Sequence, residues 1–173
     1  MEMLILVNEK DDEIGYAPKE ECHIWPAKRH RAFSIFIFNS KTEMLIHKRA
    51  ADKKTWPGFW TNACCSHPRK GELIHGAAER RLKEELGFTT RLKHLFTFEY
   101  SAQYDAKWGE HEIDWVFAGR YDGPVNPDPK EVAECRFVPI DNIQSDIIAH
   151  PERYTPWFKL CFDKVLEKLQ KKE

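Results

Sequence analysis

The stretch Ser66–Phe88, SHPRKGELIHGAAERRLKEELGF, decides how the chain is expected to fold. Its second half predicts a helix over Ile74–Leu86, because apolar residues recur there every four positions. Gly87 follows at the position where a glycine commonly ends a helix. The helical spacing places Arg81 and Glu85 one turn apart on a shared face. The recurring apolar residues are Ala78, Leu82 and Leu86.

Around this helix the pattern predicts strands and a second helix. A hairpin is expected from two apolar runs, 32–38 and 44–47, with turn residues at 39–41. Residues 55–68, with Pro57-Gly58 and Pro68, are expected to be loop or irregular strand. Strands interleaved with two or three helices predict an α/β or α+β sandwich, and the absence of repeats or linkers predicts a single domain over residues 1–173. The other predicted elements are strands at 4–7, 92–100, 112–119 and 136–139 and an amphipathic helix at 157–169.

Composition and charge exclude several classes of protein. Lys plus Arg (27) nearly balance Asp plus Glu (28), so no global field would attract nucleic acid, and an anionic partner must be held by a local cluster. No run approaches the ~20 apolar residues of a membrane span. The first residues fit neither a signal nor a transit peptide, so a cytoplasmic protein is expected. The sequence leaves open whether it is a monomer or a homodimer.

The cysteines raise a separate question. There are five, at positions 22, 64, 65, 135 and 161, and none forms a C-x-x-C pair, so reduced thiols are expected. Cys64 and Cys65 are adjacent and lie just before His67. Such a pair could be core filler, half of a metal site, or a nucleophile or base with a spare neighbour. The spacing alone does not choose between them.

Histidine and glutamate residues suggest a metal site. Three histidines flank apolar strands, and two glutamates open the strand EHEIDWVF. Alternation along that strand puts the two glutamates on one face and His111 on the other. Three imidazoles and two carboxylates would suit a five-coordinate or octahedral Zn, Mn or Fe site. An ordinary surface or core role stays the alternative for each residue taken singly. The set is His23, His30, His67, Glu110 and Glu112.

Three basic residues are candidates to hold a phosphate group: Arg49, Lys53 and Arg81. An arginine grips a phosphate with two donors, whereas a lysine acts as a point charge. For any one of them alone, a solvated surface charge is the alternative interpretation.

The opening stretch also resembles the Nudix box, G-x5-E-x7-R-E-U-x-E-E-x-G-U, in which U is a bulky apolar residue. The chain departs from that pattern twice, with Ser66 for the first glycine and Arg81 for the glutamate that follows the arginine. Replacing that carboxylate by Arg81 should weaken metal-activated hydrolysis and add a cation for a diphosphate. The residues that match in register are Glu72, Arg80, Leu82, Glu84, Glu85, Gly87 and Phe88.

That departure, together with the segment TNACCSHP, points to one branch of this superfamily. The chain closely resembles the type 1 isopentenyl-diphosphate Δ-isomerases, which share the Nudix fold but do not hydrolyse the diphosphate. The resemblance runs from about Leu4 to beyond Trp157 and includes HIWPAKRHRAFS, IHKRAADKKTWPGFWTNACCSHP, RRLKEELG, FEYSA, GEHEIDWVF and TPWF in family order. It implies a Nudix-type α/β/α sandwich with a mixed sheet, and an isoprenoid diphosphate as substrate.

The resemblance also implies roles for individual residues. Cys65 would be the catalytic thiol, with Cys64 pointing the other way. Glu85 would help to bind a Mg²⁺ that bridges the diphosphate, and a separate Zn²⁺ or Mn²⁺ would occupy the His/Glu set named above. Tyr100 and Trp157 match active-site aromatic residues. The positions that match phosphate contacts are Lys19, Arg49, Lys53 and Arg81.

The implied reaction moves a carbon–carbon double bond, converting isopentenyl to dimethylallyl diphosphate. An acid must protonate C4 and a base must remove a proton from C2, which predicts Cys65 on one side of the substrate and Glu112 with Tyr100 on the other. A nearby cation is expected to favour the Cys65 thiolate. The face of Trp157 could stabilise the intermediate cation, and Trp56, Phe59, Trp60, Trp108 and Trp115 could exclude water. A Nudix pyrophosphohydrolase and a non-catalytic metal-binding module are the alternatives.

Overall fold

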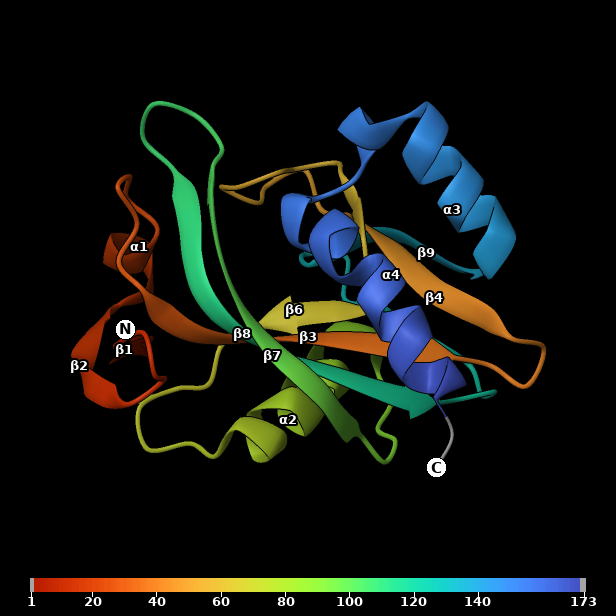
Figure 1. Cartoon of the computed structure of the whole chain (residues 1–173), viewed down its shortest axis with the longest axis horizontal. Coiled ribbons are helices and arrows are strands. Elements are labelled where there is room, and N and C mark those ends of the chain that lie inside the picture. The colour runs from red at the N-terminus through yellow and green to blue at the C-terminus, as the bar shows by residue number, and fades with distance from the viewer. Residues whose placement is uncertain (1, 172–173) are drawn as a thin grey trace.

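The computed structural model describes residues 2–171 (Figure 1). In chain order the elements are β1 (Met3–Val7), β2 (Glu13–Pro18), α1 (Lys19–Cys22), β3 (His30–Phe38), β4 (Glu43–Arg49), β5 (Trp60–Thr61), β6 (Cys64–Ser66), α2 (Ile74–Leu86), β7 (Lys93–Gln103), β8 (Gly109–Arg120), β9 (Val132–Pro139), α3 (Ile140–Ala149), the short 3₁₀ helix η1 (Pro151–Arg153) and α4 (Pro156–Gln170). Runs of two to four strands are separated by single helices, and α3, η1 and α4 follow the last strand.

The strand β3 is the centre of a mixed sheet. Along one edge it pairs in parallel with β8, from His30 opposite Glu112 to Phe38 opposite Arg120. Along its other edge it meets β1, β6 and β4 in turn, all antiparallel. The long strand β7 pairs with β8, and β9 pairs with β4. Two hydrogen-bonded edges bury β3, which explains its nearly continuous apolar sequence.

Helices α2 and α4 cover opposite faces of this sheet (Figure 1). Phe33, Ile35 and Ile37 point toward α2 and pack in the cluster that contains its buried residues. The alternate side chains, such as Phe36, pack in a second cluster with Phe158 of α4. Each face of the sheet is therefore a hydrophobic layer closed by one helix, and the predicted α/β/α sandwich with a mixed sheet is confirmed.

The helix predicted from the opening stretch has the predicted bounds, Ile74–Leu86. Gly87 ends it in the left-handed conformation, with φ of 78°, and its N–H donates to the Lys83 carbonyl at 3.0 Å. A side chain at Gly87 would also place its Cβ 2.9 Å from the carbonyl oxygen of Asn126. Glycine is thus required here both by backbone conformation and by close packing.

The other elements follow the sequence pattern with some additions. The predicted hairpin is formed by β3 and β4, and its turn is held by Asn39, whose side-chain oxygen accepts hydrogen bonds from the backbone of Lys41 and Glu43. The irregular segment 55–68 contains the short strands β5 and β6. The strand β2 and the helices α1 and α3 were not predicted. Most residues of β2 and α1 are partly or fully exposed, so their apolar pattern is weak. In α3, by contrast, Ile140, Ile143 and Ile147 recur at helical spacing, so the sequence did carry a signal for this helix.

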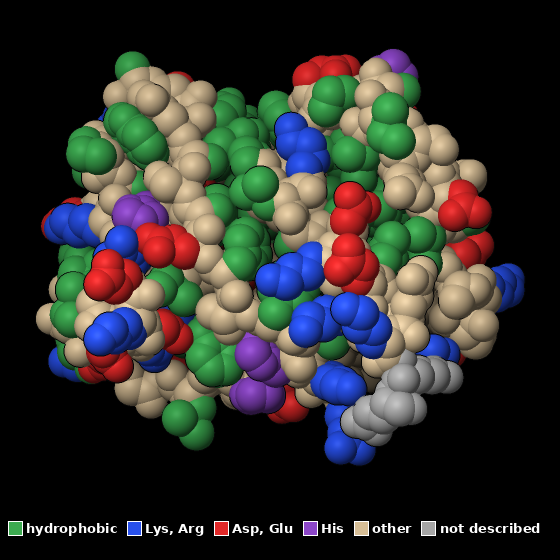
Figure 2. Space-filling view, in the orientation of Figure 1, with side chains coloured by type: hydrophobic (Ala, Val, Ile, Leu, Met, Phe, Trp, Pro, Cys, Tyr) green, Lys and Arg blue, Asp and Glu red, His purple; other side chains and the backbone are tan. Residues whose placement is uncertain are grey.

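The surface of the face drawn in Figure 2 carries interspersed acidic and basic side chains. Hydrophobic side chains gather in a hollow between the β7–β8 hairpin and the side of the molecule that carries α3. Among residues 2–171, no helix has the length and apolar character needed to cross a membrane.

Gly109 provides a test of how the start of β8 is packed. A Cβ at this position would lie 2.5 Å from the Trp25 ring and 2.7 Å from the Ala102 carbonyl oxygen. We expect Gly109→Ala to destabilise the protein by about 1–3 kcal/mol, because neither neighbour can move freely. The free energy of unfolding in urea measures this.

Gly76 is the matched control, since a Cβ there meets nothing within 4 Å and the residue lies inside α2. Gly76→Ala should be neutral or stabilising by up to about 1 kcal/mol, because alanine favours the helix. Equal urea midpoints for Gly109→Ala and the wild type would contradict the close packing at β8.

Candidate active site

The candidate site is a cavity of about 690 Å³ between α1, the loop after β4, the strands β6, β7 and β8, and the first turn of α4. It brings together residues that are far apart in the sequence. His30 and Glu85 do not line it, but each is buried in contact with a residue that does. The predicted site residues that line the cavity are Lys19, His23, Arg49, Lys53, Cys65, His67, Arg81, Tyr100, Glu110, Glu112 and Trp157.

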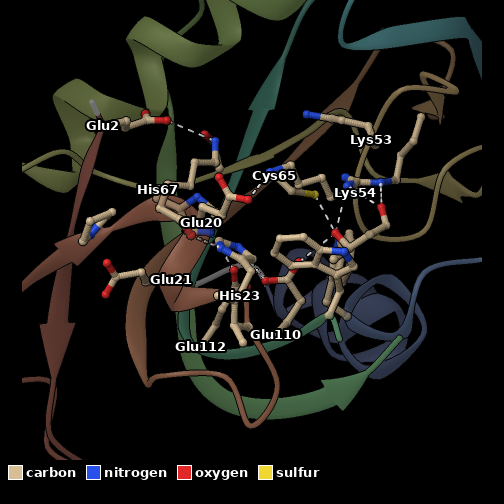
Figure 3. Close-up of a pocket in the computed structure, with 18 of the residues that line it drawn as sticks. Glu2, Glu20, Glu21, His23, Lys53, Lys54, Cys65, His67, Glu110 and Glu112 are labelled. Carbon is tan, nitrogen blue, oxygen red and sulfur yellow. Dashed lines mark hydrogen bonds and ion pairs between the residues drawn. The ribbon is translucent and has the colours of Figure 1, made fainter. Parts of the chain in front are cut away.

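The three predicted histidines and two glutamates converge at one point, with one potential ligand atom of each within 4.8 Å of the others. His67 Nε2 lies 2.8 Å from Glu112 Oε1, and His30 Nε2 lies 3.4 Å from the same oxygen. His23 Nε2 lies 2.9 Å from Glu110 Oε2. Figure 3 shows His23, Glu110 and Glu112 close together, while Glu21 points away from them. All five side chains are buried.

Contacts behind the histidines fix how two of the rings are oriented. His23 Nδ1 lies 2.6 Å from the Lys19 carbonyl, and His30 Nδ1 lies 2.7 Å from the Lys28 carbonyl. A carbonyl can only accept, so Nδ1 carries the proton and Nε2 is free to act as a ligand. Within the described residues, His30 Nε2 and Glu110 Oε2 are buried without a hydrogen-bond partner. This donor set fits a divalent cation, and the group could hold a metal ion.

Burial and the charges within this cluster shift the pKa values of its histidine and glutamate side chains. Burial lowers the pKa of His67 well below its usual value, and His30 and His23 lower it further. Burial would also lower the pKa of His23, but the Glu110 carboxylate outweighs it and raises the pKa to about 9. Burial opposes ionisation of Glu112, yet the nearby His30 and the hydrogen bond from Tyr100 lower the pKa of that carboxyl. The structure thus favours the carboxylate form of Glu112.

Cys65 faces the cavity from β6. Its thiol donates to Asn62 Oδ1 at 3.0 Å and accepts a hydrogen bond from Trp157 Nε1 at 3.0 Å. Burial and, after it, the nearby Asp114 carboxyl raise the pKa of the Cys65 thiol to about 12, although the positive charge of Arg49 lowers it. The desolvation of the sulfur outweighs the positive charge of Arg49.

Cys64 points the other way, as predicted. It is fully buried and packs in the hydrophobic cluster beneath α2. Asn62 holds this segment in place, because its amide donates to the carbonyls of Ile35 and Cys64. Adjacent residues of a strand face opposite sides of a sheet, which separates the two thiols.

Tyr100 and Trp157 complete the apolar part of the cavity. The Tyr100 hydroxyl donates to Glu112 Oε2 at 2.5 Å, and burial followed by the Glu112 charge raises the pKa of Tyr100. The ring centroids of Tyr100 and Trp157 are 6.2 Å apart, and Trp56 packs edge-on against Trp157. Trp108 also lines the cavity. Trp115 was predicted to do so, but it lies on the opposite face of β8 and donates to Asp11.

Arg81 and Lys53 are joined by a shared acidic partner, Glu131. Arg81 Nη2 contacts Glu85 Oε1 at 2.5 Å and Glu131 Oε1 at 3.0 Å. Lys53 pairs with the other oxygen of Glu131. Burial would raise the pKa of Glu131, but Lys53 and Arg81 together lower it to about 2. Lys19 is more exposed and lies 3.2 Å from Glu2 Oε2.

Three residues near the cavity were not predicted. The Thr55 hydroxyl donates a hydrogen bond to Glu110 Oε1. Glu131 forms ion pairs with both Arg81 and Lys53. Asp114 is buried on the same face of β8 as Glu112 and accepts a hydrogen bond from Ser34 at 2.7 Å. Only Asp114 carried a usable signal, because the alternation that selected Glu110 and Glu112 continues to it.

Comparison with known proteins identifies the family. A NUDIX-domain family profile matches residues 28–158. The chain is 41% identical to isopentenyl-diphosphate Delta-isomerase 1 of Photorhabdus laumondii, over 96% of both chains. It is 39% identical to isopentenyl-diphosphate Delta-isomerase II of Clarkia breweri, over 95% of this chain and 66% of that one.

The chain belongs to the isopentenyl-diphosphate Delta-isomerase family of NUDIX-domain proteins. Solved structures support the fold of this family. The crystal structure of DR0079 from Deinococcus radiodurans superposes with a TM-score of 0.71 at 20% identity. The match covers 86% of this chain and 90% of DR0079. A MutT protein from Methanosarcina mazei gives a TM-score of 0.67 at 20% identity, over 83% of this chain and 96% of that one.

The metal centre of this isopentenyl-diphosphate Delta-isomerase family member can be tested without an activity assay. We expect His67→Ala to lower the affinity for a divalent cation by at least about tenfold, since it removes one of five converging ligands. Metal retained after dialysis, measured by mass spectrometry, reports this. His111→Ala is the control, because His111 lies on the opposite face of β8 and contacts Glu99. Equal metal content in both variants would contradict the predicted site.

The Glu131 network predicts a pH dependence of stability. Its pKa of about 2 lies below the ~4.3 of an unfolded chain, so ionised Glu131 stabilises the fold above about pH 4. That contribution is lost as the pH falls toward 2. Glu131→Gln should therefore be less stable than the wild type at neutral pH, with a difference that shrinks on acidification.

Urea denaturation between pH 6 and pH 3 would measure this difference. Glu134→Gln changes an exposed acid whose nearest cation, Arg136, is 3.9 Å away, and it should show no comparable trend. A constant difference between wild type and Glu131→Gln across this range would contradict the network.

Proposed function

We propose that this protein converts isopentenyl diphosphate to dimethylallyl diphosphate in isoprenoid biosynthesis. Its curated relatives are named for this isomerisation. One observation carries the proposal. The Cys65 thiol and the Tyr100–Glu112 pair line a single cavity that also contains buried cations. This is the arrangement that a proton addition and a proton removal on one small anionic substrate require.

The diphosphate is bound by the basic residues of the cavity. Arg49 and Arg81 provide planar donors for phosphate oxygens, and Lys53 and Lys19 provide point charges. Glu85 lies directly behind Arg81 and is the carboxylate proposed to bind Mg²⁺ together with the diphosphate. Arg81 thus stands between this carboxylate and Glu131, where it can exchange one anionic partner for a phosphate.

The second metal is proposed to be Zn²⁺ or Mn²⁺ in the buried His/Glu cluster. The donor set of imidazoles and carboxylates suits either ion. Such a cation would neutralise the charge of the two glutamates and shift the proton equilibrium of Glu112. The chain itself supplies the orientation, through the backbone carbonyls that hold His23 and His30.

Proton transfer is proposed to run between two sides of the substrate. In the reactive state one proton has passed from Cys65 to the Tyr100–Glu112 pair. The pair delivers that proton to C4, and the Cys65 thiolate takes the proton from C2, which restores the thiol and the Glu112 carboxylate. The high pKa of Cys65 means that its thiolate is a strong base once formed. Trp157 donates to that sulfur and presents a buried indole near the position of the cation at C3. An indole face stabilises a desolvated cation by about 2 kcal/mol.

Exclusion of water is the remaining requirement, because water would capture the intermediate cation. Trp56 and Trp157 are nearly fully buried and pack against each other beside Cys65. Trp108 stands at the other side of the cavity, covered by the side chains of Lys54 and Lys107. These aromatic walls support a reaction that forms a carbocation.

Two alternative functions remain as outcomes to be tested. A pyrophosphohydrolase would need a carboxylate at position 81, whereas this chain has an arginine that neutralises Glu85. A non-catalytic metal-binding module would show no turnover even in the wild type, so a substitution at Cys65 could not lower it.

The first measurement is an isomerase assay with isopentenyl diphosphate and Mg²⁺, followed by acid treatment that hydrolyses only the allylic product. We expect acid-labile product from the wild type. Cys65→Ala should lower kcat by about 10²–10⁴-fold, the usual contribution of a group that transfers a proton.

Cys64→Ala is the matched control, since its thiol packs beneath α2 and does not reach the cavity. It should keep most of the activity. Release of inorganic phosphate without allylic product would favour the hydrolase instead, and the absence of any turnover after metal reconstitution would favour the binding module.

A further inference from the structure

Thr55, in the loop between β4 and β5, touches both charged parts of the cavity. The residue is only 5% exposed. Its hydroxyl donates to Glu110 Oε1 at 3.0 Å. Its backbone carbonyl accepts from Arg49 Nη2 at 2.9 Å and from Arg49 Nε at 3.2 Å. One residue therefore joins the His/Glu cluster to a cation of the diphosphate region.

The contact between Thr55 and Glu110 gives the two carboxylate oxygens of Glu110 different partners. Oε1 accepts the hydrogen bond from Thr55, while Oε2 lies 2.9 Å from His23 Nε2, one of the other candidate ligand atoms. The threonine hydroxyl thus turns Oε2 toward the point where the ligand atoms converge. Partners of this kind, behind a metal ligand, commonly change metal affinity by about 10–100-fold.

The contacts with Arg49 show a cation that lacks a counter-ion. Arg49 is 8% exposed, and no carboxylate of residues 2–171 lies within ion-pair distance of it. Its hydrogen bonds go to Thr55 and to the Trp56 carbonyl, and its guanidinium lies over the Trp157 ring. A buried, unpaired cation is costly unless an anion joins it, so its position serves an anionic ligand.

The backbone of this loop is held in an unusual conformation. Trp56 has a φ of 44°, which is in the left-handed region although the residue is not glycine. Such a conformation costs on the order of 1–3 kcal/mol and persists where the surroundings fix it. Here the Trp56 indole is buried and packs against Trp157, so the loop is fixed in the shape that presents both carbonyls to Arg49.

We propose that Thr55 is a positioning residue whose hydroxyl aims the Glu110 carboxylate into the metal centre while its backbone holds Arg49 toward the diphosphate. The loop thereby sets the distance between the metal and the anion. This proposal rests on the proposed function for the identity of the anion, but its claim about Glu110 concerns metal binding alone.

The test compares Thr55→Val, which keeps the shape but removes the donor, with Thr55→Ser, which restores the donor. The metal-free proteins are titrated with Zn²⁺ in competition with a chromophoric chelator. We expect Thr55→Val to weaken Zn²⁺ binding by about tenfold or more, and Thr55→Ser to remain close to the wild type. A valine that binds Zn²⁺ as tightly as the wild type would overturn the proposal.

Two further measurements separate positioning from a merely structural effect. Thr90→Val removes a threonine hydroxyl that bonds to the Arg120 carbonyl away from the cavity, and it should leave the Zn²⁺ affinity unchanged. If Thr55→Val fails to fold, Thr55→Ala serves in its place with the same expectation. In the isomerase assay, added metal should restore most of the activity of Thr55→Val; activity that stays low at saturating metal would contradict a role through metal binding.

The two proposals fail in different ways. A wild-type protein without isomerase activity would overturn the proposed function, yet the Zn²⁺ titrations would still decide the role of Thr55. Conversely, unchanged Zn²⁺ affinity in an active Thr55→Val enzyme would remove the role of Thr55 and leave the isomerase assignment intact.

Discussion

The site depends on the parallel pairing of β3 with β8. That register places His30 opposite Glu112, although the two residues are more than 80 positions apart in the sequence. A shift by one residue would turn Glu110 and Glu112 to the α2 face and bring His111 into the cavity, because strand side chains alternate. The apolar residues further along the same strands resist such a shift, since Phe33, Ile35 and Phe117 must face α2. The core that stabilises the sheet thus also fixes the metal ligands.

The cavity concentrates buried charge that the fold does not need for its own stability. Glu110, Glu112 and Asp114 follow one another on a single face of β8, and each is less than a tenth exposed. Burial and then the charge of Glu112 raise the pKa of Asp114 well above its usual value. Arg49 is a buried cation without a carboxylate partner among the described residues. Buried, incompletely paired groups are destabilising, and they occur together where ligands complete their partners.

Whether a feature of the fold or of the site could be predicted from the sequence depends on whether the residues that determine it are close together in the chain. The period of Ala78, Leu82 and Leu86 was sufficient to place α2 within its observed bounds, and alternation separated Glu110 and Glu112 from His111. Residue types suggested the candidate metal and phosphate residues and the resemblance assigned their roles, and the structure places most of them around one cavity. Thr55 and Glu131 were missed because each acts through a contact with a distant part of the chain, to Glu110 and Arg81 respectively. Nothing in the local pattern of a loop records such a partner.

The paired cysteines show how a strand produces two environments from one residue type. Cys64 and Cys65 are adjacent in β6, which pairs with β3 in the middle of the sheet, so each side chain must enter a different layer. The α2 layer is purely hydrophobic around Cys64, where a thiol is simply a small apolar side chain. In the opposite layer Cys65 has two hydrogen-bond partners. The Asn62 side-chain oxygen accepts a hydrogen bond from its S–H, and the Trp157 N–H donates one to its sulfur. A sulfur held from both sides has a defined orientation, and this orientation is what the fold supplies to Cys65.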